Sequence, residues 1–171
     1  MSERTTLREF QQDLSRRLAA AAASRSENHS VLAVESGGDA WLVALVDAGE
    51  VMPVPKLTAA PLIKPWYAGI ANIRGALYSV VDFSAFLGCA PVRLGGAARL
   101  LLCGQKHGLN AGVLVDRVLG LRDARELEPV DREAASPAWH KSSRRDRDGR
   151  LYRELDAGAL VHSTEFMNVG I

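Results

Sequence analysis

The chain has 171 residues, of which 47% are hydrophobic and 24% charged, a composition typical of ordinary globular proteins rather than of disordered ones. A chain of this length is sufficient for one domain, or for two small subdomains in close contact, and should bury about 70% of its unfolded surface. Its 21 Lys and Arg residues nearly balance its 20 Asp and Glu residues, so the net charge of +1 excludes a strong overall attraction to nucleic acid or acidic lipid.

Three features of the sequence concern the compartment of the protein. The longest run without Asp, Glu, Lys or Arg is residues 83–92, far shorter than the roughly 20 apolar residues that span a bilayer. Residues 1–4 contain no apolar signal core, so a cytoplasmic protein is expected. Cys89 and Cys103 are the only cysteines, and in the absence of an export signal we expect both to be buried free thiols.

Residues 1–28 differ from the rest of the chain and are predicted to form an amphipathic helical extension ahead of a domain at residues 29–171. Thr6 and Glu9 have the spacing of a capping box, in which each side chain accepts a hydrogen bond from the other residue's backbone N–H group. Apolar side chains recur every three or four positions, at Leu7, Phe10, Leu14 and Leu18. This apolar stripe is expected either to pack on the body of the same chain or to dock on a partner or a second copy.

From residue 30 the pattern changes to that of β-strands. Residues 31–34 and 41–46 are predicted to form a hairpin around the turn Gly37-Gly38-Asp39. Residues 51–54 are predicted to form a further strand.

A proline-rich loop follows. Prolines at positions 53, 55, 61 and 65 each remove a backbone donor and restrict the preceding residue, so regular structure is not expected here. Pro65 is expected to lie in the first turn of a short helix that starts at Lys64.

Residues 69–88 are the most informative stretch. Residues 77–81 are apolar and rich in β-branched side chains, which predicts a buried strand. Asp82 then suits the N-cap of a short helix over residues 83–87, and Gly88 suits its end.

A turn is predicted immediately before this strand, at Asn72-Ile73-Arg74-Gly75. Gly75 can adopt a positive φ without steric cost, and such a turn presents Arg74 outward. The Arg74 guanidinium has the donors to bind a carboxylate in two places at once. That carboxylate belongs either to a partner or to an Asp or Glu of the same chain.

The second half of the chain is predicted to be mainly strands. Residues 99–103 and 110–115 form a second predicted hairpin, and residues 118–121 are expected to continue the same sheet. Residues 151–155 should form the last strand, followed by a short helix capped by Asp156.

The segment from Lys141 to Arg153 raises an alternative function. Its basic side chains could follow a phosphate backbone, which would make the protein a small nucleic-acid-binding β-barrel. However, acidic residues alternate with the basic ones, and Asp148-Gly149 is typical of a hairpin turn, so a solvated hairpin tip explains the same pattern.

Motifs for catalysis or cofactor binding are not found. The sequence contains neither of the glycine-rich motifs that bind nucleotide phosphates, and neither cysteine has a cationic neighbour that would activate it. No two histidines have the close spacing of a zinc site; they are His29, His107, His140 and His162. We therefore expect no enzyme activity, no cofactor and no metal, and a function in surface recognition.

Three segments of residues 69–88 carry a resemblance to a known family. Gly-Ile-x-Asn-Ile-Arg-Gly, a strand ending in Val-Val-Asp, and Phe-x-x-Phe-Leu-Gly together resemble the central signature of CheW-like coupling domains. The similarity extends from about residue 31 to residue 161, and residues 45–88 are most similar to the twitching-motility variant of the family.

The resemblance implies a mainly β fold of two intertwined, SH3-like, five-stranded barrels with short helices. It implies a non-catalytic adaptor that joins the cytoplasmic tip of a chemoreceptor to the regulatory domain of a CheA-type histidine kinase, in a system that controls type IV pili. It also places Asn72, Ile73, Arg74 and Gly75 at a partner interface. One departure is that the predicted last strand carries Arg153 and Glu154, which leaves open whether this strand closes its barrel.

Overall fold

The computed structural model describes residues 29–103, 105–132 and 134–171. The predicted helical extension, residues 1–28, lies outside these described residues. The strands are β1 (Ser30–Ser36), β2 (Asp39–Ala44), β3 (Ala48–Pro53), β4 (Tyr67–Ile73), β5 (Ala76–Asp82), β6 (Arg99–Cys103), β7 (Ala111–Val115), β8 (Arg117–Asp123), β9 (Glu128–Val130), β10 (His140–Arg145) and β11 (Leu151–Leu155). The short helices are α2 (Phe83–Phe86), α3 (Ala157–Val161) and α4 (Thr164–Met167), with 3-10 turns η1 (Gln105–His107) and η2 (Ala124–Glu126).

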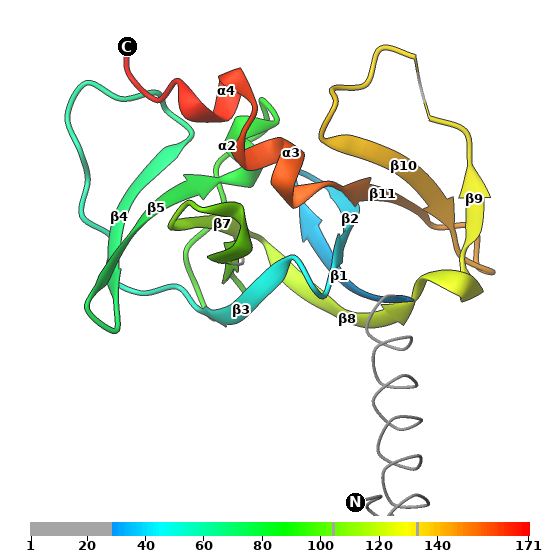
Figure 1. Cartoon of the computed structure of the whole chain (residues 1–171). Helices are drawn as coiled ribbons and strands as arrows, with labels where there is room; N and C mark the ends of the chain where they lie inside the picture. Colours follow the sequence, from blue (N-terminus) through cyan, green and yellow to red (C-terminus); the bar gives the residue numbers. More distant parts are fainter. Residues whose placement is uncertain (1–28, 104, 133) are drawn as a thin grey trace, which may run out of the picture.

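The strands form two sheets that lie side by side as two lobes (Figure 1). The first sheet has the order β8-β1-β2-β11-β10-β9 and the second the order β3-β6-β7-β5-β4. The chain starts in the first sheet, builds the whole second sheet, and then returns to complete the first. The first sheet therefore contains both the first and the last strand, which makes the lobes intertwined as predicted, although β9 gives this sheet six strands instead of five. The described chain ends beside the second lobe, where Gly170 bridges Ile63 (Figure 1).

The tight turn between β1 and β2 agrees with the local sequence. Gly37 and Gly38 both have positive φ, at 63° and 83°, between the paired residues Ser36 and Asp39. This is the geometry of a two-residue loop whose twist matches that of the flanking strands, and glycine adopts it without strain. The predicted first hairpin is thus confirmed.

The charged last strand lies inside its sheet. Strand β11 pairs in parallel with β2 and antiparallel with β10. Arg153 forms an ion pair with Asp39 and lies over the Trp41 ring, and Glu154 forms an ion pair with Arg144. The strand tolerates its charges because each has an opposite charge on a neighbouring strand or hairpin.

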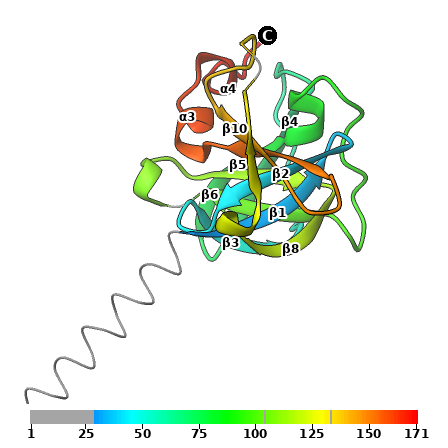
Figure 2. The ribbon, with the colours of Figure 1, turned by 90° about the vertical axis from the view of Figure 1, so that its right-hand side faces the viewer.

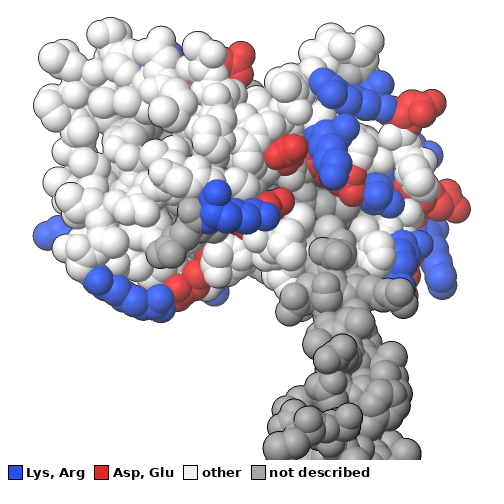
Figure 3. Space-filling model, in the orientation of Figure 1, with Lys and Arg blue, Asp and Glu red and all other residues white. Residues whose placement is uncertain are grey.

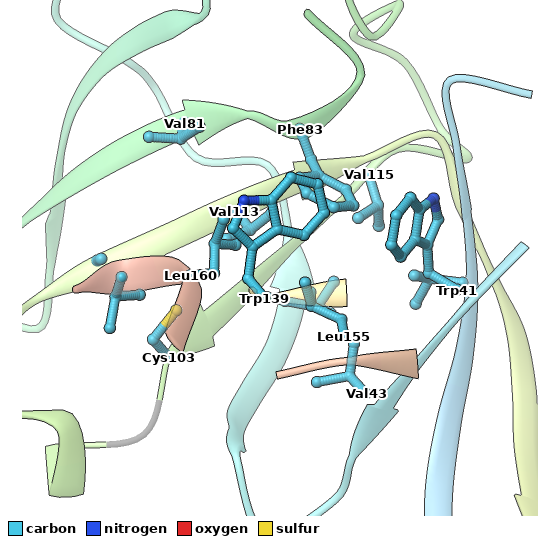
Figure 4. Close-up of a cluster of buried hydrophobic side chains, with 14 of the residues drawn as sticks. Trp41, Val43, Val81, Phe83, Cys103, Val113, Val115, Trp139, Leu155 and Leu160 are labelled. Atoms are coloured by element: carbon cyan, nitrogen blue, oxygen red, sulfur yellow. The ribbon is translucent and has the colours of Figure 1, made fainter. Parts of the chain in front are cut away.

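The main hydrophobic core lies between the two sheets (Figure 4). Trp139, which precedes β10, has its ring centroid 5.8 Å from Trp41 of β2 and 6.0 Å from Phe83 of α2. Trp66 is half-buried and packs on Phe86 with ring centroids 5.2 Å apart. Because one core holds side chains from both sheets, the lobes are expected to unfold together.

The predicted helix at Lys64 is wrong. Residues 64–67 form a turn, in which Tyr67 N donates to the Lys64 carbonyl oxygen at 3.0 Å, and Tyr67 begins β4. Proline at the second position favours a β-turn as much as a first helical turn, so the local signal is ambiguous.

The predicted continuation of the second sheet by residues 118–121 is also wrong. These residues belong to β8, which pairs with β1 in the first sheet. The chain changes sheet at Asp116, whose backbone N donates to the Glu35 carbonyl oxygen at 2.9 Å and whose Oδ2 accepts from Gly37 N at 3.1 Å.

The two cysteines have different environments. Cys103 is buried, as predicted, and burial raises the pKa of its thiol to about 12. Cys89 is exposed, contrary to the prediction, because it lies on the surface loop that follows α2. Both are free thiols.

Candidate partner-binding surface

The tip of the β4–β5 hairpin is a two-residue loop formed by Arg74 and Gly75. The flanking residues Ile73 and Ala76 are paired, and both loop residues have positive φ, at 53° for Arg74 and 85° for Gly75. The Asn72 Oδ1 atom accepts a hydrogen bond from Gly75 N at 3.0 Å. Three residues of the Asn-Ile-Arg-Gly motif therefore have a structural role: Asn72 stabilises the turn, Ile73 is buried, and Gly75 relieves backbone strain.

The Arg74 side chain lies at the surface and is held in one orientation. It is 75% exposed, and its two terminal nitrogens donate to the two Glu50 carboxylate oxygens at 2.7 and 2.8 Å. Arg74 thus has the intrachain partner that the sequence left open. An exposed ion pair contributes only about 0–1 kcal/mol, so this contact orients the guanidinium without removing it from solvent.

The Arg74–Glu50 pair also shows how the second sheet is curved. Glu50 lies on β3 and Arg74 follows β4, and these two strands are the opposite edges of the sheet. Their contact means that the sheet curls until its edges face one another, as in a barrel. The sequence did not single out Glu50, because this pairing depends on the curvature of the whole sheet.

Beside the ion pair, the surface is hollowed. A solvent-open depression of about 350 Å³ lies between β3 and the β4–β5 hairpin. Its lining residues are Gly49, Glu50, Ile73, Arg74, Ala76, Tyr78, Leu102 and Cys103. The lining combines the charged side chains of Glu50 and Arg74 with apolar ones such as Ile73, so the depression offers contacts to a polar and to an apolar group of a partner. We refer to this depression with Arg74 and Glu50 as the hairpin site.

Asp82 supports the hairpin site from the other end of β5. Its Oδ1 accepts from Ala85 N at 3.0 Å, which caps α2 as predicted, and its Oδ2 accepts from Val92 N at 2.8 Å. One buried carboxylate therefore holds the strand end, the helix and the following loop together.

Three of the six basic side chains in the segment of the alternative hypothesis form ion pairs with carboxylates of the same chain. Arg150 pairs with Glu35 at 3.0 Å, and the ion pairs of Arg153 and Arg144 are described above. Figure 3 shows blue and red side chains intermixed over this lobe rather than a continuous basic surface. Asp146 also accepts from the backbone N of Asp148 and of Arg150, so the segment is the solvated hairpin tip that the sequence indicated. A phosphate-binding surface is not favoured.

Within residues 29–103, 105–132 and 134–171, no three His, Cys, Asp or Glu side chains are grouped so that they could hold a metal ion. In the same part of the chain, no helix has the length and apolar character needed to cross a membrane.

Comparison with known proteins places the chain in a family. Residues 30–165 match the family model described as CheW-like domain. The chain belongs to the CheW-like family. This confirms the family recognised from the Asn-Ile-Arg-Gly signature, and it makes the protein a non-catalytic scaffold of chemotaxis-type signalling.

Individual relatives agree with this assignment. The chain is 28% identical over 167 residues to Protein PilI of Pseudomonas aeruginosa, covering 91% of this chain and 90% of that protein. Its fold is similar to that in the crystal structure of the scaffolding protein TtCheW from Thermoanaerobacter tengcongensis, with a TM-score of 0.67 and 19% sequence identity. That similarity covers 84% of this chain and 99% of the TtCheW chain, so it extends over both lobes of the CheW-like fold.

Proposed function

We propose that this CheW-like protein is a cytoplasmic coupling adaptor that joins the cytoplasmic tip of a chemoreceptor to the regulatory domain of a CheA-type histidine kinase. We further propose that the system controls type IV pili and twitching motility, which the similarity to PilI supports. In this proposal the coupling unit is residues 29–171, and residues 1–28 are an extension outside it.

We propose the hairpin site, with Asn72, Ile73, Arg74 and Gly75, as a surface that contacts one of these partners. The observation that carries this proposal is the Arg74 guanidinium, which is 75% exposed, fixed in orientation by Glu50 and next to a depression with both polar and apolar lining residues. A partner with an acidic residue beside an apolar one fits both features.

On partner binding, Arg74 would exchange the Glu50 carboxylate for a carboxylate of the partner. Separating Arg74 from Glu50 costs little, because the pair is exposed and worth about 0–1 kcal/mol. A carboxylate brought by a partner would bind Arg74 at an interface from which water is excluded, where bidentate arginine contacts are stronger. Arg74 therefore favours the bound state even though it already has a partner in the free protein.

The first test is a charge reversal with a matched control. Arg74→Glu should leave the circular dichroism spectrum unchanged and weaken binding to the purified kinase regulatory domain or receptor tip by at least about tenfold. Arg93→Glu makes the same charge change at an exposed loop position away from the hairpin site and should bind normally. If Arg74→Glu binds both partners with unchanged affinity in calorimetry, Arg74 is not at an interface.

A charge swap separates a binding role from a structural one. The double variant Arg74→Glu/Glu50→Arg keeps an ion pair between β3 and the hairpin but reverses its direction. If Arg74 serves only to hold the sheet edges together, the swap should restore binding. If Arg74 contacts the partner, the swap should remain as weak as Arg74→Glu, and this is the result that we expect.

A further inference from the structure

We propose that residues 6–23 pack back on their own chain, with the stripe of Leu7, Phe10, Leu14 and Leu18 against the six-stranded sheet beside the start of β1. The stripe contains four large apolar side chains on one face of an amphipathic sequence. Burying each of them is worth about 1.5–3 kcal/mol relative to exposure in water, so the stripe favours any apolar surface within reach.

Such a surface lies where β1 begins. Val46 is 46% exposed and Leu121 is 59% exposed, although both are large apolar residues. Leu121 lies on the edge strand β8 opposite the third residue of β1, and Val46 follows Ala44, which pairs with Val31. Val46 therefore lies near the point at which the segment joins the sheet, whereas Leu121 shares the face of Leu32, opposite to the face of Val31.

A hollow of about 100 Å³ lies in the same region, with Val31, Ala44 and Leu155 in its lining. The rest of the lining is Leu42, Asp47, Lys141, Glu154 and Asp156. The acidic side chains have partners: Asp47 pairs with Lys106 at 2.5 Å, Glu154 with Arg144, and Asp156 caps α3. Two of the three carboxylates thus have a cationic partner and the third a backbone donor, so the aliphatic side chains of the lining are the part of the hollow that an apolar residue would contact.

The short connection favours the segment of the same chain over other occupants. Residues 24–29 separate the amphipathic segment from β1, and six extended residues span at most about 20 Å. A connection of this length holds the segment at an effective concentration on the order of millimolar. A weak apolar contact is then enough for intramolecular docking, whereas a second copy or a partner must compete from dilute solution.

Disulfide trapping in the full chain tests the proposal. In the predicted helix, the spacing places Gln11, three or four residues from Leu7 and Leu14, on the flank of the stripe and Gln12 on the opposite face. We compare Gln11→Cys/Val46→Cys with the matched control Gln12→Cys/Val46→Cys, both in a Cys89→Ser background. Cys103 can remain because it is buried and its thiol has a raised pKa of about 12.

The expected result is a monomeric, internally cross-linked product that forms at least about fivefold faster for the Gln11 pair than for the Gln12 pair. Adding Leu14→Glu to the Gln11 pair should remove this advantage without changing the circular dichroism of the strands. Equal cross-linking rates for the two pairs would overturn intramolecular docking. A disulfide-linked dimer as the main product would also overturn it, and would show that the stripe docks on a second copy of the chain. None of these measurements depends on Arg74 or on kinase binding.

Discussion

The Trp41 and Phe83 rings meet edge to face across the boundary between the lobes, with centroids 5.1 Å apart and an interplanar angle of 71°. Trp41 comes from β2 of the first sheet, and Phe83 from the helix that follows β5 of the second. Because Phe83 is fully buried, this contact joins α2 of the second lobe to the first sheet within the shared core. In both Figure 1 and Figure 2, α3 and α4 lie together at one side of the molecule, and the main core includes Leu160 of α3 and Phe166 of α4.

Replacing the aromatic ring at this boundary should destabilise the whole domain. Phe83→Ala removes a fully buried ring from the core between the lobes and should lower the free energy of unfolding by about 3–5 kcal/mol. Chemical denaturation should still show a single transition, because the core is shared. Leu77→Ala, at an exposed site on β5, is the control and should change stability by less than about 0.5 kcal/mol.

Removal of the Asp82 carboxylate should affect the helix and the loop together. Asp82→Ala deletes the acceptor of two backbone N–H groups, at Ala85 and Val92, and should cost about 2–3 kcal/mol. Asp123→Ala removes an exposed cap at η2 and should cost less. Equal losses of stability in thermal unfolding would show that the contact with Val92 contributes nothing.

A backbone contact makes Gly69 sensitive to substitution. A Cβ atom at Gly69 would lie 2.5 Å from the Thr58 carbonyl oxygen, and its φ is +135°. Gly69→Ala should therefore destabilise the protein by more than about 2 kcal/mol, because either β4 or the proline-rich loop must move. Gly95→Ala, where a Cβ meets open space and φ is not positive, should be nearly neutral. An unchanged free energy of unfolding for Gly69→Ala would mean that the proline-rich loop can move away from the new Cβ atom without destabilising the protein.

The stability contributed by Glu35 should depend on pH. Arg117 chiefly, and Arg150 in addition, hold the pKa of the Glu35 carboxyl below its ordinary value of 4.5. The pKa is lower in the folded state, so the contribution is present above the unfolded pKa and is lost as pH falls through the folded pKa. Glu35→Gln should be less stable than the parent at pH 7, by no more than about 1 kcal/mol, and the difference should shrink below pH about 4.5. A difference that stays constant down to pH 2 would contradict this linkage.

The two thiols should react at very different rates. Exposed Cys89 should be modified by iodoacetamide in the native protein, whereas Cys103 is buried and its pKa of about 12 leaves almost no thiolate at pH 8. Mass spectrometry should show one modification before unfolding and two in denaturant. Rapid double modification of native protein would indicate that β6 opens readily.

The sequence by itself determined the features that depend on neighbouring residues. The turn at Gly37 and Gly38, the cap at Asp82 and the exposed Arg74 tip follow from local backbone preferences and short hydrogen bonds, and all three were predicted correctly. The signature around Arg74 also identified the family, because it records the turn and the strand as a contiguous stretch of sequence.

The tertiary structure alone decided which distant segments meet. The pairing of Arg74 with Glu50, the transfer of β8 to the first sheet and the parallel pairing of β11 with β2 each join residues far apart in the chain. These contacts depend on how two curled sheets share one core, which no local preference encodes. The turn at Pro65 shows the same limit, because a local signal compatible with both helix and turn was resolved only by the pairing of β4 with β5.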